Sequence, residues 1–178
     1  MESLAGRINY KRLSPFLWSE LTGNHTIENY FAKRGFPRSI LTSEQEVAYE
    51  WRENFISTFL ERDLLQWRGF TQATMRRLWQ MLAHNNGQTV DYSSLAKSLG
   101  VSDVTIKNYI DLLESTFMVD VVQLYISNLG KRLVKAPKVY VSDSGICSTL
   151  LGISSFEAMS GHPLFGAMWE QIVLHNLK

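Results

Sequence analysis

Residues 89–117, TVDYSSLAKSLGVSDVTIKNYIDLLESTF, decide the fold class of this chain. The pattern predicts two helices joined by a tight turn at Gly100, where a residue without Cβ takes a positive φ at little cost. Ser102 is expected to cap the second helix, with Asp103 at its positive end. Apolar side chains then recur at helical spacing and form one expected inner face: Ile106, Tyr109, Ile110, Leu113 and Phe117. The stretch therefore indicates a helix-turn-helix, which makes nucleic-acid binding the first functional hypothesis.

The residues after this motif predict the wing of a winged helix. Residues 117–126 and 139–141 are rich in β-branched and aromatic side chains, which favours two strands, and residues 89–90 supply a short first strand. The loop between the two later strands, residues 127–138, is basic. Its cations have no acid among them and suit the phosphates of a DNA backbone: Lys131, Arg132, Lys135 and Lys138. The alternative is a solvated basic loop without a partner.

The expected outer face of the second helix carries more acid than base. Its candidate DNA contacts are the small polar and cationic side chains Ser102, Thr105, Lys107 and Asn108. Asp103, Asp111 and Glu114 share that face, and the phosphate backbone repels them. A helix-turn-helix that packs on another protein is therefore an equal alternative to one that contacts DNA.

Helices are predicted over most of the remaining chain. Their expected positions are residues 25–34, a helix that begins at a capping box in residues 43–46, and residues 57–68, 72–85 and 166–177. Residues 35–37 are a turn signal. In the last helix one apolar side is expected to face inward: Trp169, Ile172, Val173 and Leu177. The predicted fold class is mixed α/β, mainly α-helical, with a helical bundle and a winged helix-turn-helix.

Composition narrows the function classes only a little. The chain of 178 residues is 45% hydrophobic and 20% charged, so it can bury a real core. A net charge of +1 means that any nucleic-acid affinity comes from local patches. One cysteine, Cys147, fits a reducing compartment, and no apolar run approaches the length of a membrane span, so a cytoplasmic protein is expected. The four histidines are scattered, which argues against a zinc site.

Several stretches, in order along nearly the whole chain, resemble one known family. It is the domain of unknown function that lies C-terminal to the P-loop core in many bacterial and archaeal AAA-type ATPases. Residues 4–8 (LAGRI) and 13–21 look like its lead-in, and 35–37 (GFP) like its glycine-aromatic-proline turn. The helix-turn-helix and basic wing match, as do four motif residues of unknown role: Arg62, Asp63, Asp143 and Glu170.

This resemblance implies a division of the chain and of its parent protein. Residues 1–23 would link to the ATPase core, 24–86 would form a helical bundle, 87–146 the winged helix-turn-helix, and 147–178 the start of a truncated nuclease-like region. The chain has no G-x-x-x-x-G-K-[ST] loop, so ATP and Mg²⁺ would bind elsewhere in the parent. Of the nuclease carboxylates only Glu170 is matched, and one carboxylate does not make a metal site.

Two of the family-matched motifs also have ordinary structural interpretations. Arg62 and Asp63 are expected to form an ion pair or a cap between helices. Asp143 follows a strand and precedes Gly145, which is typical of a turn-forming aspartate that accepts backbone N–H groups. A catalytic role for either motif is the less favoured interpretation.

Three functions follow for a fragment that is not itself expected to be an enzyme. The leading hypothesis is a non-catalytic module of an AAA-type ATPase that binds DNA through residues 102–117 and the wing. The first alternative is a protein-interaction module that packs on the ATPase core or on a partner. The second alternative is a fragment of a nuclease-like effector. None of the three involves a membrane or a metal bound by these residues.

Overall fold

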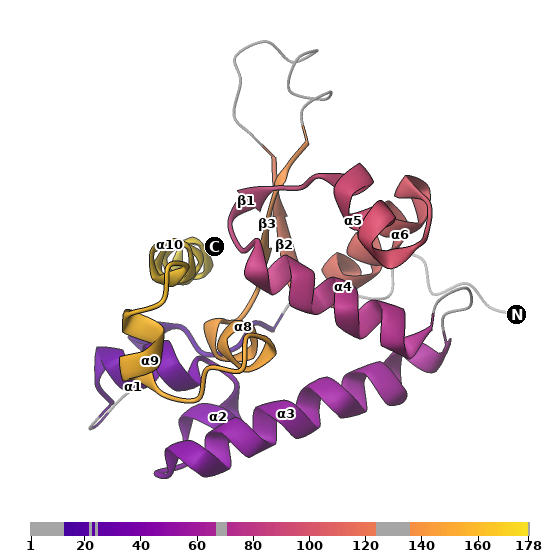
Figure 1. Ribbon diagram of the computed structural model, residues 1–178. Coiled ribbons are helices and arrows are strands. Elements are labelled where there is room, and N and C mark those ends of the chain that lie inside the picture. Colours follow the sequence, from indigo (N-terminus) through magenta and orange to yellow (C-terminus); the bar gives the residue numbers. More distant parts are fainter. Residues whose placement is uncertain (1–12, 22, 24, 67–70, 124–135, 178) are drawn as a thin grey trace, which may run out of the picture.

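The computed structural model of the protein describes residues 13–21, 23, 25–66, 71–123 and 136–177 (Figure 1). Within these ranges the fold is mixed α/β and mostly helical, with a small antiparallel sheet. The predicted fold class is confirmed at this level. Among the described residues, no helix combines the length and the apolar character needed to cross a membrane.

The N-terminal helices carry the first differences from the sequence prediction. They are η1 (Trp18–Glu20), α1 (Ile27–Lys33), α2 (Pro37–Ile40), α3 (Gln45–Glu61) and η2 (Asp63–Gln66). The capping box predicted at residues 43–46 is wrong, because Glu44 is the N-cap of α3 and makes no side-chain cap bond. The Ser43 carbonyl instead accepts a hydrogen bond from Lys33 Nζ at 3.0 Å. One long helix, α3, also replaces the two helices expected from this part of the sequence.

The central elements follow the order predicted from residues 72–141. They are α4 (Gln72–His84), β1 (Gln88–Thr89), α5 (Tyr92–Leu99), α6 (Asp103–Ser115), β2 (Val119–Val122) and β3 (Lys138–Val141). The strand order is β1-β3-β2, and both pairings are antiparallel. Val119 pairs with Val141 and Val122 with Lys138, so residues 123–137 connect two neighbouring strands. Figure 1 shows α5 and α6 beside this sheet, with α4 across its base.

Helix α8 (Ser144–Leu150) lies at the centre of the molecule. All seven of its residues are buried, and it packs against α1, α3, α4 and α10. The domain boundary expected between residues 146 and 147 falls inside this helix. Cys147 is buried there, and burial raises the pKa of its thiol well above the ordinary value. The helix thus joins the N-terminal helices to α4, α10 and the strand β3 through shared packing.

The last helix turns only part of the predicted face inward: Ile172 is buried as expected, whereas Trp169, Val173 and Leu177 are exposed. After α9 (Phe156–Ser160), α10 (Phe165–Asn176) buries Met168, Gln171, Ile172 and His175. The side chains of Trp169, Val173 and Leu177 are 45%, 42% and 79% exposed. Hydrophobicity alone misplaced the other three residues, because two polar side chains of the inner face find partners in the interior. Gln171 Nε2 donates to the Ser142 carbonyl, and the His175 ring lies against the Pro15 carbonyl.

Candidate functional site

Side-chain caps and a glycine shape the turn between α5 and α6. Asp91 Oδ1 accepts the N–H of Ser94 at 2.9 Å at the start of α5. Gly100 ends that helix with a φ of 68°. Ser102 Oγ then accepts the N–H of Thr105 at 3.1 Å and starts α6. The helix, turn and helix predicted here are confirmed, together with the cap at Ser102.

The inner face of α6 matches the predicted stripe except at its end. Ile106, Tyr109, Ile110 and Leu113 are buried as expected. Phe117 does not belong to the stripe, because α6 ends at Ser115 and the Phe117 side chain is 55% exposed. The N–H groups of Phe117 and Met118 bond the carbonyls of Glu114 and Leu113, which is a Schellman closure. Phe117 takes the left-handed position, with a φ of 63°, that glycine usually fills.

Of the predicted DNA contacts on α6, some side chains already make hydrogen bonds within the protein and others are exposed. The hydroxyls of Ser102 and Thr105 bond each other at 2.8 Å, so they serve the helix cap first. Asp103 accepts a hydrogen bond from Ser93 Oγ at 2.5 Å, which ties α6 to α5. Lys107 and Asn108 are exposed on the outer face. Close to them stands Val104, an apolar side chain that is 68% exposed.

The basic wing is described only at its end. Lys131, Arg132 and Lys135 lie outside the described residues. Lys138 is the first residue of β3, and its Nζ lies 3.7 Å from Glu170 Oε1 on α10. Both side chains are partly exposed, so the ion pair contributes little to stability. It does reduce the positive charge that Lys138 would present to a phosphate.

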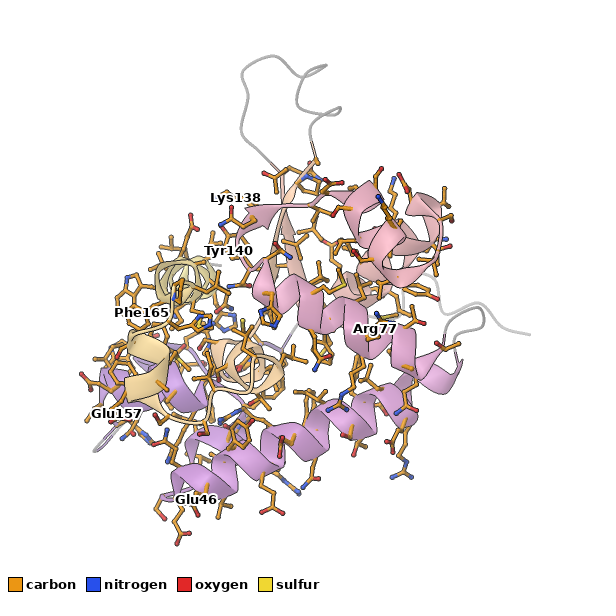
Figure 2. All side chains as sticks on the ribbon, in the orientation of Figure 1. Glu46, Arg77, Lys138, Tyr140, Glu157 and Phe165 are labelled. Atoms are coloured by element: carbon orange, nitrogen blue, oxygen red, sulfur yellow. The ribbon has the colours of Figure 1, made fainter. Side chains whose placement is uncertain are left out.

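Glu170, one of the four family-matched residues, joins α10 to the sheet. Its Oε2 accepts a hydrogen bond from the Tyr140 hydroxyl at 2.8 Å. Burial of the Tyr140 ring and the bond to this carboxylate raise the pKa of that hydroxyl. Glu170 therefore holds Tyr140 and Lys138 of β3 at once. Figure 2 places these two side chains of the central strand β3 on the side of the sheet toward α10.

Arg62 and Asp63 stand at the end of α3 and the start of η2. Arg62 is the C-cap of α3, where its N–H bonds the Thr58 carbonyl. Asp63 begins η2, and both side chains are exposed. Of the two expected arrangements, an ion pair or a cap between helices, the ion pair does not occur among the salt bridges of the described residues, whereas Arg62 does occupy a cap position. Neither side chain lines the cavity beside Asp143 or the smaller one beside Val90.

A buried polar cluster, made of Lys33, Arg34, Ser39, Arg52, Asp143 and Thr149, was not predicted from the sequence. Arg52 on α3 donates from Nε to Thr149 Oγ1 and from Nη1 to Ser39 Oγ, both at 2.9 Å. Ser39 Oγ in turn donates to the Lys33 carbonyl at 2.6 Å. These bonds connect α1, α2, α3 and α8 in the interior.

Asp143 is the carboxylate of the polar cluster. Its Oδ1 accepts the N–H of Ile146 at 2.9 Å, the backbone contact expected from the sequence. Its Oδ2 lies 4.0 Å from Arg34 Nε, and both side chains are almost fully buried. Burial raises the pKa of Asp143, while Arg34 opposes that rise. Burial likewise lowers the pKa values of Arg34 and Arg52, against the attraction of Asp143.

Arg34 is the least satisfied member of the polar cluster. Its side chain is 0% exposed, and its three guanidinium nitrogens make no hydrogen bond within the described residues. It lies over the Tyr30 ring, 5.3 Å from the ring centroid. Its backbone also takes a positive φ of 57° at the end of α1. A strained backbone and a buried cation together indicate that the surrounding packing determines this conformation.

One sequence signal pointed toward this cluster. Arg52 is spaced four residues from both Ala48 and Ile56, so it occupies the inner face of α3. A cation on an otherwise apolar face requires buried hydrogen-bond partners. Their identity was not readable, since Thr149 lies 97 residues away along the chain. No group of three or more His, Cys, Asp or Glu side chains within the described ranges is arranged to hold a metal ion.

Comparison with known proteins places the chain within a family without a known role. Residues 24–157 match the family described as "Domain of unknown function (DUF8612)". An uncharacterized protein of Mycobacterium tuberculosis and one of Mycobacterium bovis are each 38% identical to the chain over 177 residues. That alignment covers 99% of this chain and 40% of each relative, so the chain spans less than half of their length. No solved structure matches.

Proposed function

The chain belongs to the DUF8612 family of domains of unknown function, and we propose that it is a non-catalytic, DNA-binding winged-helix module. The observation that carries this proposal is the order of β1, α5, α6, β2 and β3 with the strand order β1-β3-β2. In a winged helix the second helix of the turn faces the major groove, and the hairpin after it reaches the backbone. Here the strands β2 and β3 and their connection follow α6 in that same order along the chain.

Charge supports the wing as the main contact with DNA. The connection, residues 123–137, contains Lys131, Arg132 and Lys135 and has no Asp or Glu. Lysine and arginine supply most phosphate contacts, and each contact releases counterions from the duplex. The function therefore rests first on these three cations, with Lys138 moderated by Glu170.

The first turns of α6 supply the second contact. Lys107 and Asn108 are exposed there and have the donors that base edges accept. Asp111 and Glu114 follow on later turns and would be repelled by phosphates. We therefore infer a shallow docking of α6 through its N-terminal half.

The parent protein is proposed to be an AAA-type ATPase. The chain spans 40% of the length of its mycobacterial relatives, which leaves room for a catalytic core outside it. ATP and Mg²⁺ would bind in that core, and this module would present DNA to it. ATP hydrolysis by a full-length relative, lost when its P-loop lysine is replaced, tests this part of the proposal.

A second function is supported by Val104. An apolar side chain that is 68% exposed on the outer face of α6, beside acids, suits a protein surface better than DNA. In this alternative α6 packs on the ATPase core or on a partner. The proposed nuclease-like fragment has less support, because Glu170 already bonds Tyr140 and pairs with Lys138.

A salt-dependent titration tests DNA binding. A labelled duplex is titrated with the 178-residue chain by fluorescence anisotropy between about 50 and 200 mM salt, where phosphate contacts give a steep salt slope. The Lys131→Ala/Arg132→Ala variant should bind the duplex at least about tenfold more weakly. The slope of log K against log salt concentration should become shallower by about 1.8, because each phosphate contact contributes about 0.9 to it.

A matched variant controls for net charge. Arg38→Ala/Arg77→Ala also removes two exposed cations, and Figure 2 shows Arg77 on α4, away from β2 and β3. It should leave the affinity nearly unchanged. Absence of binding at about 50 mM salt would exclude the DNA function. Loss of association with the rest of the parent protein in Val104→Asp would then support the second function.

A further inference from the structure

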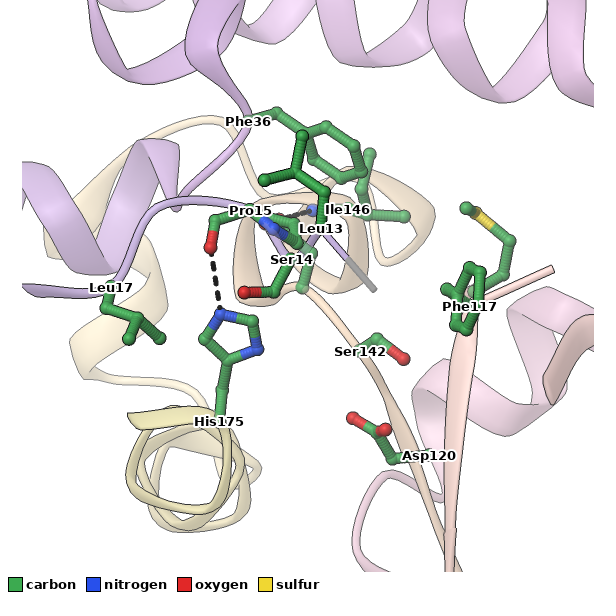
Figure 3. A pocket seen from close by; sticks show the side chains of 12 residues that line it. Leu13, Ser14, Pro15, Leu17, Phe36, Phe117, Asp120, Ser142, Ile146 and His175 are labelled. Atoms are coloured by element: carbon green, nitrogen blue, oxygen red, sulfur yellow. Dashed lines mark hydrogen bonds between the residues drawn. The ribbon is translucent and has the colours of Figure 1, made fainter. Parts of the chain in front are cut away.

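A cavity of about 390 Å³ lies apart from the outer face of α6. One wall comes from the N-terminal segment, through residues 13–15 and 17. The others come from the start of β2, the residues after β3, the start of α8, and α10. His175 Nε2 on α10 lies 3.2 Å from the Pro15 carbonyl oxygen, and this contact joins α10 to the N-terminal segment. Figure 3 shows Asp120 and Ser142 side by side across the cavity from Leu13 and Phe36. Its volume is in the range of small-molecule sites.

Two polar atoms in the lining are buried without a hydrogen bond among the described residues. They are Asp143 Oδ2 and Ser142 Oγ. The Asp143 side chain is only 4% exposed. Arg34 Nε lies 4.0 Å from Oδ2, which is beyond hydrogen-bond distance. Oδ2 can therefore still accept a hydrogen bond from another donor. Buried acceptors of this kind are almost always satisfied in native proteins, which points to a ligand with donor groups.

The charge of the lining selects the kind of ligand. Asp120 and Asp143 contribute two carboxylates to the lining, and no lysine or arginine lines the cavity within the described part of the chain. Arg34 lies 4.0 Å from Asp143 Oδ2 and partly offsets that charge, but it is not part of the lining. An anionic ligand would be repelled by both carboxylates. A purely apolar ligand would cover Oδ2 and Oγ and leave them unsatisfied, which costs free energy. A ligand that carries an ammonium group meets both requirements.

The remaining lining suits an apolar body attached to that ammonium group. Phe36, Phe117 and Ile146 bring aromatic and aliphatic surface, and Leu13 and Pro15 add to it. We propose that this cavity binds a small organic cation, its ammonium group donating to Asp143 and Ser142 and its apolar body packing on Phe36 and Phe117. The site is independent of the proposed DNA contacts.

A pair of nearly isosteric probes tests this site. 2-Phenylethylammonium and neutral 2-phenylethanol are titrated into the 178-residue chain by two-dimensional NMR. We expect the cation to bind with a dissociation constant of about 1 mM, the scale for a ligand of this size, and the alcohol about tenfold more weakly. The largest shifts should occur at the amides of Asp120, Ser142 and Asp143. Equal binding of the two probes, or shifts elsewhere, would overturn the proposal.

Variants distinguish binding of the cation in the cavity from non-specific attraction to acidic side chains. Asp120→Asn should weaken the cation at least about tenfold without affecting the alcohol, because it removes one of the two charges. Asp111→Asn removes an acid from the exposed face of α6 and should change neither affinity. Equal weakening in both variants would contradict a specific site. The binding data for Asp143→Asn are interpreted only if the NMR spectrum of this variant shows that it keeps the native fold.

A third probe identifies the source of the ammonium group. The capped tripeptide acetyl-Leu-Lys-Phe-amide carries the same group on a peptide. Tighter binding of this peptide than of 2-phenylethylammonium, still sensitive to Asp120→Asn, supports the cavity as an ammonium site and assigns the cation to a lysine side chain. Tighter binding of the small amine supports a free ligand. Failure of both cations to bind at about 10 mM, tenfold above the scale for such ligands, overturns the proposal.

Discussion

The helix-turn-helix and the polar cluster are built on opposite principles. In α5 and α6, caps and apolar contacts come from residues a few positions apart, such as Ser102 with Thr105. In the polar cluster, Arg52 bonds Thr149 across 97 residues, and Arg34 faces Asp143 from another helix. The first region hides apolar surface, and the second hides charge. Local patterns therefore define the first region, while only the assembled helices define the second.

The difference has an energetic consequence. A buried apolar side chain loses packing when it is shortened, in proportion to the cavity left behind. A buried charge that loses its partner retains its full cost of desolvation. We expect the polar cluster to be the more sensitive region, and the following predictions test that contrast.

The largest effect is expected when the carboxylate of the polar cluster is removed. Asp143→Ala removes the carboxylate that acts most strongly on the buried Arg34 and Arg52, and it removes the cap of α8. We expect a loss of about 3–5 kcal/mol in the free energy of unfolding, measured by urea denaturation. Asp111→Ala, on the exposed face of α6, is the control and should stay within about 0.5 kcal/mol. Equal losses would remove the contrast between the regions.

Substitutions at two glycines separate two causes of destabilisation, namely lack of space for a side chain and an unfavourable backbone conformation. A Cβ on Gly35 would lie 2.5 Å from the Phe16 carbonyl oxygen, so Gly35→Ala should cost about 1–3 kcal/mol through overpacking. Gly100 has a φ of 68°, and a Cβ added there would meet no described neighbour within 4 Å. Gly100→Ala should therefore cost about 1 kcal/mol through its conformation alone. Thermal unfolding compares the two.

Asparagine provides the decisive comparison for these glycines. It tolerates the left-handed region, so Gly100→Asn should recover most of the loss seen with alanine. Gly35→Asn should be at least as harmful as Gly35→Ala, because the obstacle is the Phe16 backbone. The same response at both positions would show that space and conformation had been assigned wrongly.

Helix caps provide a smaller and sharper test. Ser102→Ala removes the acceptor for the Thr105 N–H and should cost about 1 kcal/mol. Ser43→Ala, in the capping box that the structure does not form, should cost less than about 0.5 kcal/mol. The free energy of unfolding from urea titrations measures both. A larger loss at Ser43 would reinstate the cap predicted from the sequence.

The smallest effect concerns the outer face of α6. Under the proposed DNA function, Asp111→Asn/Glu114→Gln removes repulsion and should raise the affinity for duplex about threefold at low salt, because like charges near phosphates weaken binding. Anisotropy titration measures the change. Under the protein-docking alternative the same variant should leave DNA affinity unchanged and weaken association with the partner.

Local sequence patterns predicted much of the helix-turn-helix but failed in specific places. The stripe of α6 was right up to Leu113, yet Phe117 was assigned to it although a Schellman closure turns that residue outward. In α10 the apolar residues Trp169 and Val173 were assigned inward, whereas Gln171 and His175 occupy that face. The first error arose because a local closure of the helix end turns Phe117 outward. The second arose because hydrophobicity does not reveal hydrogen-bond partners that are distant in the sequence, here the Ser142 and Pro15 carbonyls.

The sequence by itself determined the elements of this protein: its mainly helical character, the turn at Gly100 and the cap at Ser102. These follow from backbone preferences and from contacts between residues a few positions apart. Tertiary structure alone decided the polar cluster, the central position of α8 and the cavity beside Asp143. Buried charges require partners in three dimensions, and those partners lie on helices that packing brings together.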